Sequence, residues 1–169
     1  MIKLSVRLGD GRLKETWMFF LRMIVLALPL YFGILFVDLY SFQAITAYNS
    51  FQVMEGMGLH PSIEGPMMSV GDFNFFISKD STGWKSMVFL GAMVLAVPAV
   101  AWKRRAIGLA IGIPLIYLGN LARIVGIVLA EQAWGYDAAI VTHDWLWRSG
   151  LVAIVLGIWI LWMRWAKWK

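Results

Sequence analysis

The sequence predicts an all-α integral membrane protein with about four transmembrane helices, and an outer loop that carries an amphipathic helix and a short β-hairpin. Three observations lead to this fold class. First, 60% of the 169 residues are hydrophobic, which is too many for a soluble domain to cover with polar surface. Second, the apolar residues form four long runs. Third, the basic residues flank these runs mainly on one side.

The four runs lie at about residues 17–39, 84–102, 106–130 and 145–165, within a single membrane domain that covers residues 1–169. We expect the first to be a retained span, kinked at Pro29, because polar residues precede it and no small-residue cleavage site follows it. The second stops before a basic triplet that begins at Lys103. The fourth has Trp residues near its ends, as interfacial helices often do.

Charge distribution predicts that both ends of the chain lie on the cytoplasmic side. One set of helix flanks is basic and holds Lys3, Arg7, Arg12, Lys14, Lys103, Arg104, Arg105, Arg164, Lys167 and Lys169. The other set is acidic and holds Asp38, Glu55, Glu64, Asp72, Asp80, Glu131, Asp137 and Asp144. We therefore expect a multi-pass protein of the plasma membrane whose chemistry faces the outside.

The outer loop, residues 40–83, contains two patterns. Residues 40–56 place Phe42, Ile45, Tyr48 and Phe51 at helical spacing, which predicts an amphipathic helix. Farther along, Gly and Pro residues separate the runs 67–70 and 73–77, which predicts a β-hairpin.

Several classes of partner are disfavoured. The net charge of +5 comes from residues that flank apolar runs, so we expect no nucleic-acid binding. The chain has no Cys and only two His, so we expect no disulfide, no metal site and no cofactor. His60, next to a Pro in the loop, is best interpreted as a surface residue.

A polar cluster at the outer helix ends is the candidate site. Besides Arg22, the basic residues outside the inner flanks are Lys79, Lys85, Arg123 and Arg148. Arg123 lies about 10–12 Å deep in the third span, where a guanidinium needs a polar pocket or a partner. Asn120 is three residues earlier, so both side chains share one helix face.

The residues suggest acyl-transfer chemistry. Ser81 opens the second span and His143 precedes the fourth, so antiparallel helices bring both close to Arg123. Ser81 would be the nucleophile, His143 the general base, and Arg123 a clamp for the developing oxyanion. Structural alternatives remain open. Arg123 can pair with Asp144 or Asp137, His143 can cap the fourth helix, and Ser81 or Asp80 can be the N-cap of the second.

Three segments resemble the exosortase/archaeosortase family. They are Asp80-Ser81-Thr82-Gly83-Trp84-Lys85-Ser86, then Asn120-Leu121-Ala122-Arg123-Ile124, and then His143. In that family the first segment carries a Cys, which completes a Cys, Arg, His triad at the outer ends of membrane helices. The resemblance covers about residues 65–165 and implies that Arg123 and His143 keep their family roles. Asp80, Asn120, Lys85, Arg148 and Asp144 are expected to support the site or bind substrate.

The resemblance implies a membrane-embedded cysteine transpeptidase. Such an enzyme cleaves C-terminal sorting signals of exported proteins and passes the acyl group, through a thioester, to a lipid-linked acceptor. Ser81 departs from the family pattern, either because Cys was replaced by design or because this is a natural Ser variant, and the intact flanking motif favours replacement. A hydroxyl is a weaker nucleophile than a thiolate, so we expect this form to be inactive but able to bind substrate.

Two other functions compete with this interpretation. An intramembrane serine protease would use Ser81 and His143 as a dyad, although the Gly-x-Ser-Gly context is absent. A transporter or assembly subunit would use Arg123 and Asn120 only as polar contacts between helices. For substrate binding, small residues on the third span permit either a groove for a substrate helix or internal packing, and these are Gly108, Gly112, Gly119 and Gly126.

Overall fold

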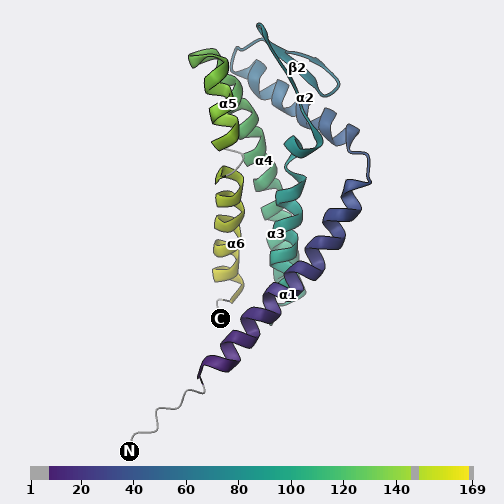
Figure 1. The fold of residues 1–169 in the computed structure, drawn as a ribbon, viewed down its shortest axis with the longest axis vertical. Coiled ribbons are helices and arrows are strands. Elements are labelled where there is room, and N and C mark those ends of the chain that lie inside the picture. The colour runs from purple at the N-terminus through teal and green to yellow at the C-terminus, as the bar shows by residue number, and fades with distance from the viewer. Residues whose placement is uncertain (1–7, 146–148, 168–169) are drawn as a thin grey trace, which may run out of the picture.

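The computed structural model describes residues 8–145 and 149–167 of the chain. In these ranges the elements in chain order are α1 (Leu8–Leu35), α2 (Tyr40–Gly56), β1 (Ser62–Glu64), β2 (Met67–Val70), β3 (Phe73–Phe76), the 3-10 helix η1 (Lys79–Thr82), α3 (Trp84–Ala96), α4 (Trp102–Trp134), α5 (Tyr136–Trp145) and α6 (Leu151–Lys167). The protein is therefore mainly helical with one small sheet. Figure 1 shows α3, α4 and α6 as the bundle, with α1 leaning against α3.

The bundle core is apolar and lies between α3, α4 and α6. Its buried residues include Leu90 and Val94 of α3, Ile116 of α4 and Val155 of α6. At one end, Arg105 donates to the carbonyl oxygens of Leu95 (2.9 Å), Val97 (2.9 Å) and Val100 (3.1 Å). These bonds satisfy the Leu95 carbonyl in the last turn of α3 and two carbonyls of the connection that follows it.

Two helices in the described part of the chain are long and apolar enough to cross a bilayer, namely Leu13–Leu35 of α1 and Trp102–Trp134, the whole of α4. Helix α3 has 13 residues and α6 has 17. At 1.5 Å per residue these lengths fall short of the roughly 30 Å hydrocarbon core. The arrangement of four spans with both ends inside therefore stays a prediction.

Helix boundaries differ from those expected in the second half of the chain. The helix predicted for residues 84–102 is α3, and it ends at Ala96. The basic triplet therefore lies in the first turn of α4 and not at the end of α3. The expected fourth helix is shorter and begins at Leu151. A separate helix, α5, precedes it after Gly135, whose φ of 84° breaks α4. His143 therefore lies in the last turn of α5 and does not cap α6.

A cap made of α2 and the sheet covers one end of the bundle (Figure 1). The predicted hairpin is present as β2 and β3, and β1 pairs with β2 to give an antiparallel sheet of order β1-β2-β3. Strand β1 was not predicted, because three residues give too little alternation to recognise.

Helix α2 has the predicted bounds but buries a different face. Its buried side chains are Gln43, Thr46, Ala47, Ser50 and Met54. Of the predicted apolar stripe, Ile45 and Tyr48 point outward and are 53% and 54% exposed, whereas Phe42 and Phe51 are half-buried. Small and polar residues allow α2 to approach the sheet and α4 closely, so apolar periodicity predicted the helix and not its orientation.

Candidate functional site

Ser81 lies in a 3-10 turn whose start is fixed by Ser78. The Ser81 N–H donates to the Ser78 carbonyl (2.9 Å) and approaches the Ser78 hydroxyl at 3.3 Å. The two hydroxyls are 3.0 Å apart. Gly83, with φ of 81°, then begins α3 without a side-chain cap. Ser81 is therefore not the N-cap of α3, and neither is Asp80, so this structural alternative is wrong.

Two side chains of α4 hold the main chain of this turn. Asn120 Nδ2 donates to the Ser81 carbonyl oxygen at 2.7 Å, and Arg123 Nη2 donates to the same oxygen at 3.3 Å. Asn120 is fully buried and Arg123 is 4% exposed. Because they are three residues apart on one face of α4, both reach a single acceptor.

Gly83 allows α4 to approach the turn closely. A Cβ atom at this position would lie 3.2 Å from Cγ of Asn120 and 3.3 Å from its Cβ. The positive φ also favours glycine. The bond between Asn120 and Ser81 therefore depends on a residue without a side chain between them.

Lys79 connects the turn to α1. Its ammonium donates to the carbonyl oxygens of Ile34 (2.7 Å), Leu35 (3.1 Å) and Val37 (2.6 Å). The last carbonyls of a helix have no helical partner and carry its partial negative charge, so a cation stabilises them. The first helix and the Ser81 turn are thus joined by one side chain.

Gln43 of α2 fixes the point where β3 leads into the turn. Ile77 donates its N–H to the Pro66 carbonyl (2.9 Å), but Pro66 has no N–H to return. The buried Gln43 Nε2 donates to the Ile77 carbonyl instead, at 2.8 Å. This contact satisfies an acceptor that the sheet leaves open.

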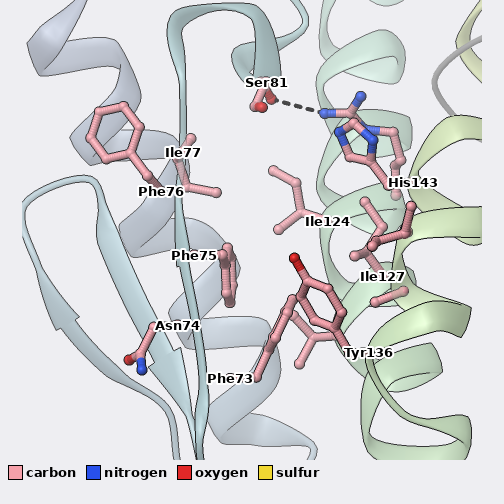
Figure 2. A pocket seen from close by; sticks show the side chains of 14 residues that line it. Phe73, Asn74, Phe75, Phe76, Ile77, Ser81, Ile124, Ile127, Tyr136 and His143 are labelled. Atoms are coloured by element: carbon pink, nitrogen blue, oxygen red, sulfur yellow. Dashed lines mark hydrogen bonds between the residues drawn. The ribbon is translucent and has the colours of Figure 1, made fainter.

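A cavity of about 290 Å³ brings Ser81, Arg123 and His143 together. The three residues come from η1, α4 and α5, and Figure 2 shows Ser81 and His143 at one end of the cavity. The dashed line in Figure 2 is the bond from Arg123 to the Ser81 carbonyl. The rest of the lining is largely apolar, and consists of Phe73, Asn74, Phe75, Phe76, Ile77, Ile124, Ile127, Val128, Tyr136, Ala139 and Ile140.

Helix α5 presents His143 to the cavity. Tyr136, Ala139, Ile140 and His143 have the spacing of one helix face, and all four line the cavity. His143 Nδ1 is 3.4 Å from the Asp144 carboxylate, and both side chains are about half exposed. A carboxylate beside a histidine can orient the ring.

Of the other residues expected to support the site, Asp80 and Lys85 are not among the described residues that line the cavity. Asp80 forms an ion pair with Lys85 at 2.8 Å on the surface, outside the residues that line the cavity. Arg148 lies outside the described residues. Among the residues that the structure describes, no group of three His, Cys, Asp or Glu side chains could hold a metal ion.

The model of the transmembrane exosortase family matches residues 4–163, nearly the whole chain. The chain belongs to the transmembrane exosortase family. Membership indicates a membrane protein and suggests transpeptidase-type activity on exported proteins that carry sorting signals. The resemblance noted from the sequence motifs is thus confirmed at the level of the family. No curated protein and no solved structure matches this exosortase.

Three of the four glycines expected on the third span pack against α6 in this exosortase. A Cβ at Gly112 would meet Leu90 of α3 at 2.6 Å and Ile158 of α6 at 3.2 Å. One at Gly119 would meet Ile154 at 2.9 Å, and one at Gly108 would overlap Trp162. Gly126 instead lines a separate hollow of about 340 Å³. Internal packing therefore describes three of these positions, although Gly108 and Gly112 also border a hollow of about 480 Å³ beside α6.

Several residues at the exosortase site were missed in the sequence. The aromatic wall formed by Phe73, Phe75 and Tyr136 comes from segments too far apart to associate by spacing. Gln43 and Ser78 gave no signal, because a polar residue in a loop or helix is usually solvated. Lys79 was recognised in the sequence as an isolated cation on the acidic side, but its contact with the end of α1 was not predicted.

Proposed function

We propose that this exosortase is a transpeptidase that cleaves C-terminal sorting signals of exported proteins and transfers them to a lipid-linked acceptor at the outer face of the plasma membrane. The observation that carries the proposal is the single cavity bordered by Ser81, Arg123 and His143. A nucleophile, a base and a cation on one cavity are the groups that acyl transfer requires.

In the proposed first step, the side chain at position 81 attacks the carbonyl carbon of the scissile peptide bond. His143 takes the proton of the attacking group, and Arg123 stabilises the negative oxygen of the tetrahedral intermediate. The C–N bond then breaks, and His143 returns the proton to the leaving nitrogen. The product is an acyl-enzyme, a thioester with Cys at position 81 or an ester with Ser.

In the second step, a hydroxyl or amine of the acceptor attacks the acyl-enzyme. His143 removes the acceptor's proton, and the side chain at position 81 regains a proton as it leaves. Water in place of the acceptor would give hydrolysis. The apolar lining of the cavity supports transfer, because it limits the water available to compete with an acceptor.

The scheme predicts slow turnover for the present chain, because its nucleophile would be the hydroxyl of Ser81. A serine hydroxyl needs more help from its base than a thiol does, since a thiol reaches its reactive anion at far lower pH. We therefore propose that Ser81→Cys restores rapid turnover, and that the Ser81 form retains substrate binding.

The test is processing of a co-expressed reporter that ends in a randomised segment of about six residues, a Leu/Ala helix of about 20 residues and a Lys/Arg tail. The present chain is compared with Ser81→Cys, alone and combined with Arg123→Ala or His143→Ala. We expect Ser81→Cys to shorten reporter members, and removal of His143 to cost about 10²–10⁴-fold. His60→Ala is the control, because His60 is the other histidine of the chain.

The product mass distinguishes transfer from hydrolysis. A mass increase beyond the cleaved reporter supports a lipid-linked acceptor, whereas a free carboxylate supports a protease. If the Ser81 form works as fast as Ser81→Cys, the thioester mechanism is wrong. If no form shortens any reporter, the proposal as a whole is rejected.

A further inference from the structure

Strand β3 is the edge of the sheet nearest the cavity. The sheet order β1-β2-β3 leaves one side of β3 without a paired strand among the described residues. All five consecutive residues 73–77 line the cavity. A sheet face would contribute only alternate residues, so the edge of β3 must border the cavity.

The hydrogen-bond pattern shows which main-chain groups point to this free edge. Ile77 donates to Pro66, and the register pairs Phe75 with Met68 and Phe73 with Val70. Bonded pairs alternate in an antiparallel ladder, so the residues bonded to β2 are 73, 75 and 77. The N–H and C=O groups of Asn74 and Phe76 therefore face away from β2.

These edge groups have no recorded partner in the described part of the chain. No hydrogen bond there reaches the main-chain N–H or C=O of Asn74 or Phe76. An edge strand with open main-chain groups is a template for an additional extended chain. Figure 2 shows this strand beside Ile124 and Tyr136, with Ser81 beyond its end.

The cavity wall beside the edge is aromatic and aliphatic. Phe73 and Phe75 stack with ring centroids 5.2 Å apart, and Phe73 meets Tyr136 at 6.3 Å. Ile124 and Ile140 add to the same wall. An extended chain on the edge would direct every second side chain into this apolar space, so it would select apolar residues at alternate positions.

We propose that the segment of the substrate next to its scissile bond binds as an added strand on the free edge of β3. Its main chain pairs with Asn74 and Phe76, and its alternate apolar side chains enter the aromatic wall. The occupant is the substrate, because the same cavity contains Ser81, only five residues after Phe76 in the chain. This inference rests on the proposed function and adds how the peptide main chain is bound and which side chains are selected.

The first test removes an edge amide in the Ser81→Cys form. Asn74→Pro deletes the N–H that faces the free edge, while the bonds of Phe73 and Phe75 to β2 remain, and Asn74→Ala deletes the side chain alone. Reporter members cleaved by Ser81→Cys serve as probes. We expect Asn74→Pro to fall about tenfold below Asn74→Ala in kcat/KM, the effect of one hydrogen bond.

The control uses the opposite edge of the sheet. By the same alternation, the N–H of Ile63 in β1 points away from β2, because Ser62 and Glu64 are the residues of β1 bonded to it. The Pro and Ala variants of Ile63 should have similar kcat/KM values. Thermal unfolding in detergent checks that each Pro variant is folded.

A second test leaves the enzyme intact. A peptide with the sequence of a cleaved reporter is methylated at one backbone nitrogen at a time and assayed with Ser81→Cys. Loss of cleavage at every second nitrogen is the expected result, because an added strand bonds through alternate residues. This readout also holds if Asn74→Pro fails to fold.

The outcomes separate the two claims. If Ser81→Cys cleaves no reporter, the proposed function falls and the inference falls with it. If it cleaves reporters, but N-methylation shows no two-residue period and any folded Asn74→Pro matches Asn74→Ala, only strand addition is overturned. The proposed transpeptidase then stands with another mode of peptide binding.

Discussion

Asn120 Nδ2 lies 2.7 Å from the Ser81 carbonyl oxygen and joins the middle of α4 to the turn that carries the candidate nucleophile. The two residues are 39 positions apart. Asn120 is fully buried, so the loss of this bond is not easily replaced by water. Position 81 should therefore be sensitive to substitutions within α4.

Asn120→Leu tests this connection. The variant keeps a similar volume but removes the donor to Ser81, so we expect a stability loss of about 1–3 kcal/mol and reduced processing by the Ser81→Cys form. Asn49→Leu is the control, because Asn49 donates to the Tyr117 hydroxyl at 2.8 Å, away from the cavity. Equal processing by the two variants would contradict a positioning role for Asn120.

Gly83→Ala should damage the site through the same contact. The added Cβ would lie 3.2 Å from Asn120 Cγ, in a backbone conformation that costs about 1–2 kcal/mol for L residues. Gly58→Ala is matched, since Gly58 has φ of 78° but no atom within 4 Å of the added Cβ. Thermal unfolding should show a larger loss of stability for Gly83→Ala than for Gly58→Ala. Equal losses would mean that the Asn120 side chain can move aside at little cost.

Lys79→Met should weaken the contact between the end of α1 and the turn that carries Ser81. The ammonium donates to the carbonyls of Ile34 and Leu35 in the last turn of that helix and to that of Val37 just beyond it, and its loss leaves them without this cation. We expect a loss of about 1–3 kcal/mol, against about 0–1 kcal/mol for Lys85→Met, whose partner Asp80 is half exposed. Unfolding in detergent measures both, and Lys79→Arg should recover part of the loss.

Gly108→Ala should weaken packing between α4 and α6. Its Cβ would overlap the Trp162 ring, so the ring must move, at a cost of about 1–3 kcal/mol. Gly157→Ala in α6 meets nothing within 4 Å, and replacing a helical glycine there should stabilise by up to about 1 kcal/mol. Opposite signs of the two shifts in melting temperature are expected. A neutral Gly108→Ala would show that Trp162 can move freely.

The sequence predicted the elements whose signals are local. Long apolar runs predicted α1 and α4, and two short runs separated by Gly and Pro residues predicted the hairpin of β2 and β3. The motif around Ser81, with Asn120 and Arg123, was also enough to indicate the family that the match to residues 4–163 confirms. Such signals need only neighbours in the chain.

The features that were missed depend on tertiary contacts. The orientation of α2 could not be predicted, because Gln43 and Ser50 are buried by close approach to other elements. Helix α5 was not predicted, because residues 136–144 gave no long apolar run and were left between the third and fourth spans. The free edge of β3 became visible only once α4 and α5 were placed beside it.

Pro66 has a further consequence for the position of Ser81. Because residue 66 lacks an amide proton, the Pro66–Ile77 pair forms only one of the two hydrogen bonds of a bonded ladder pair, and the chain leaves the sheet there. Gln43 supplies the missing donor, so α2 sets the residue at which strand becomes turn. An amide proton restored at position 66 would compete with Gln43, and the hairpin would lengthen by one pair at the expense of the turn.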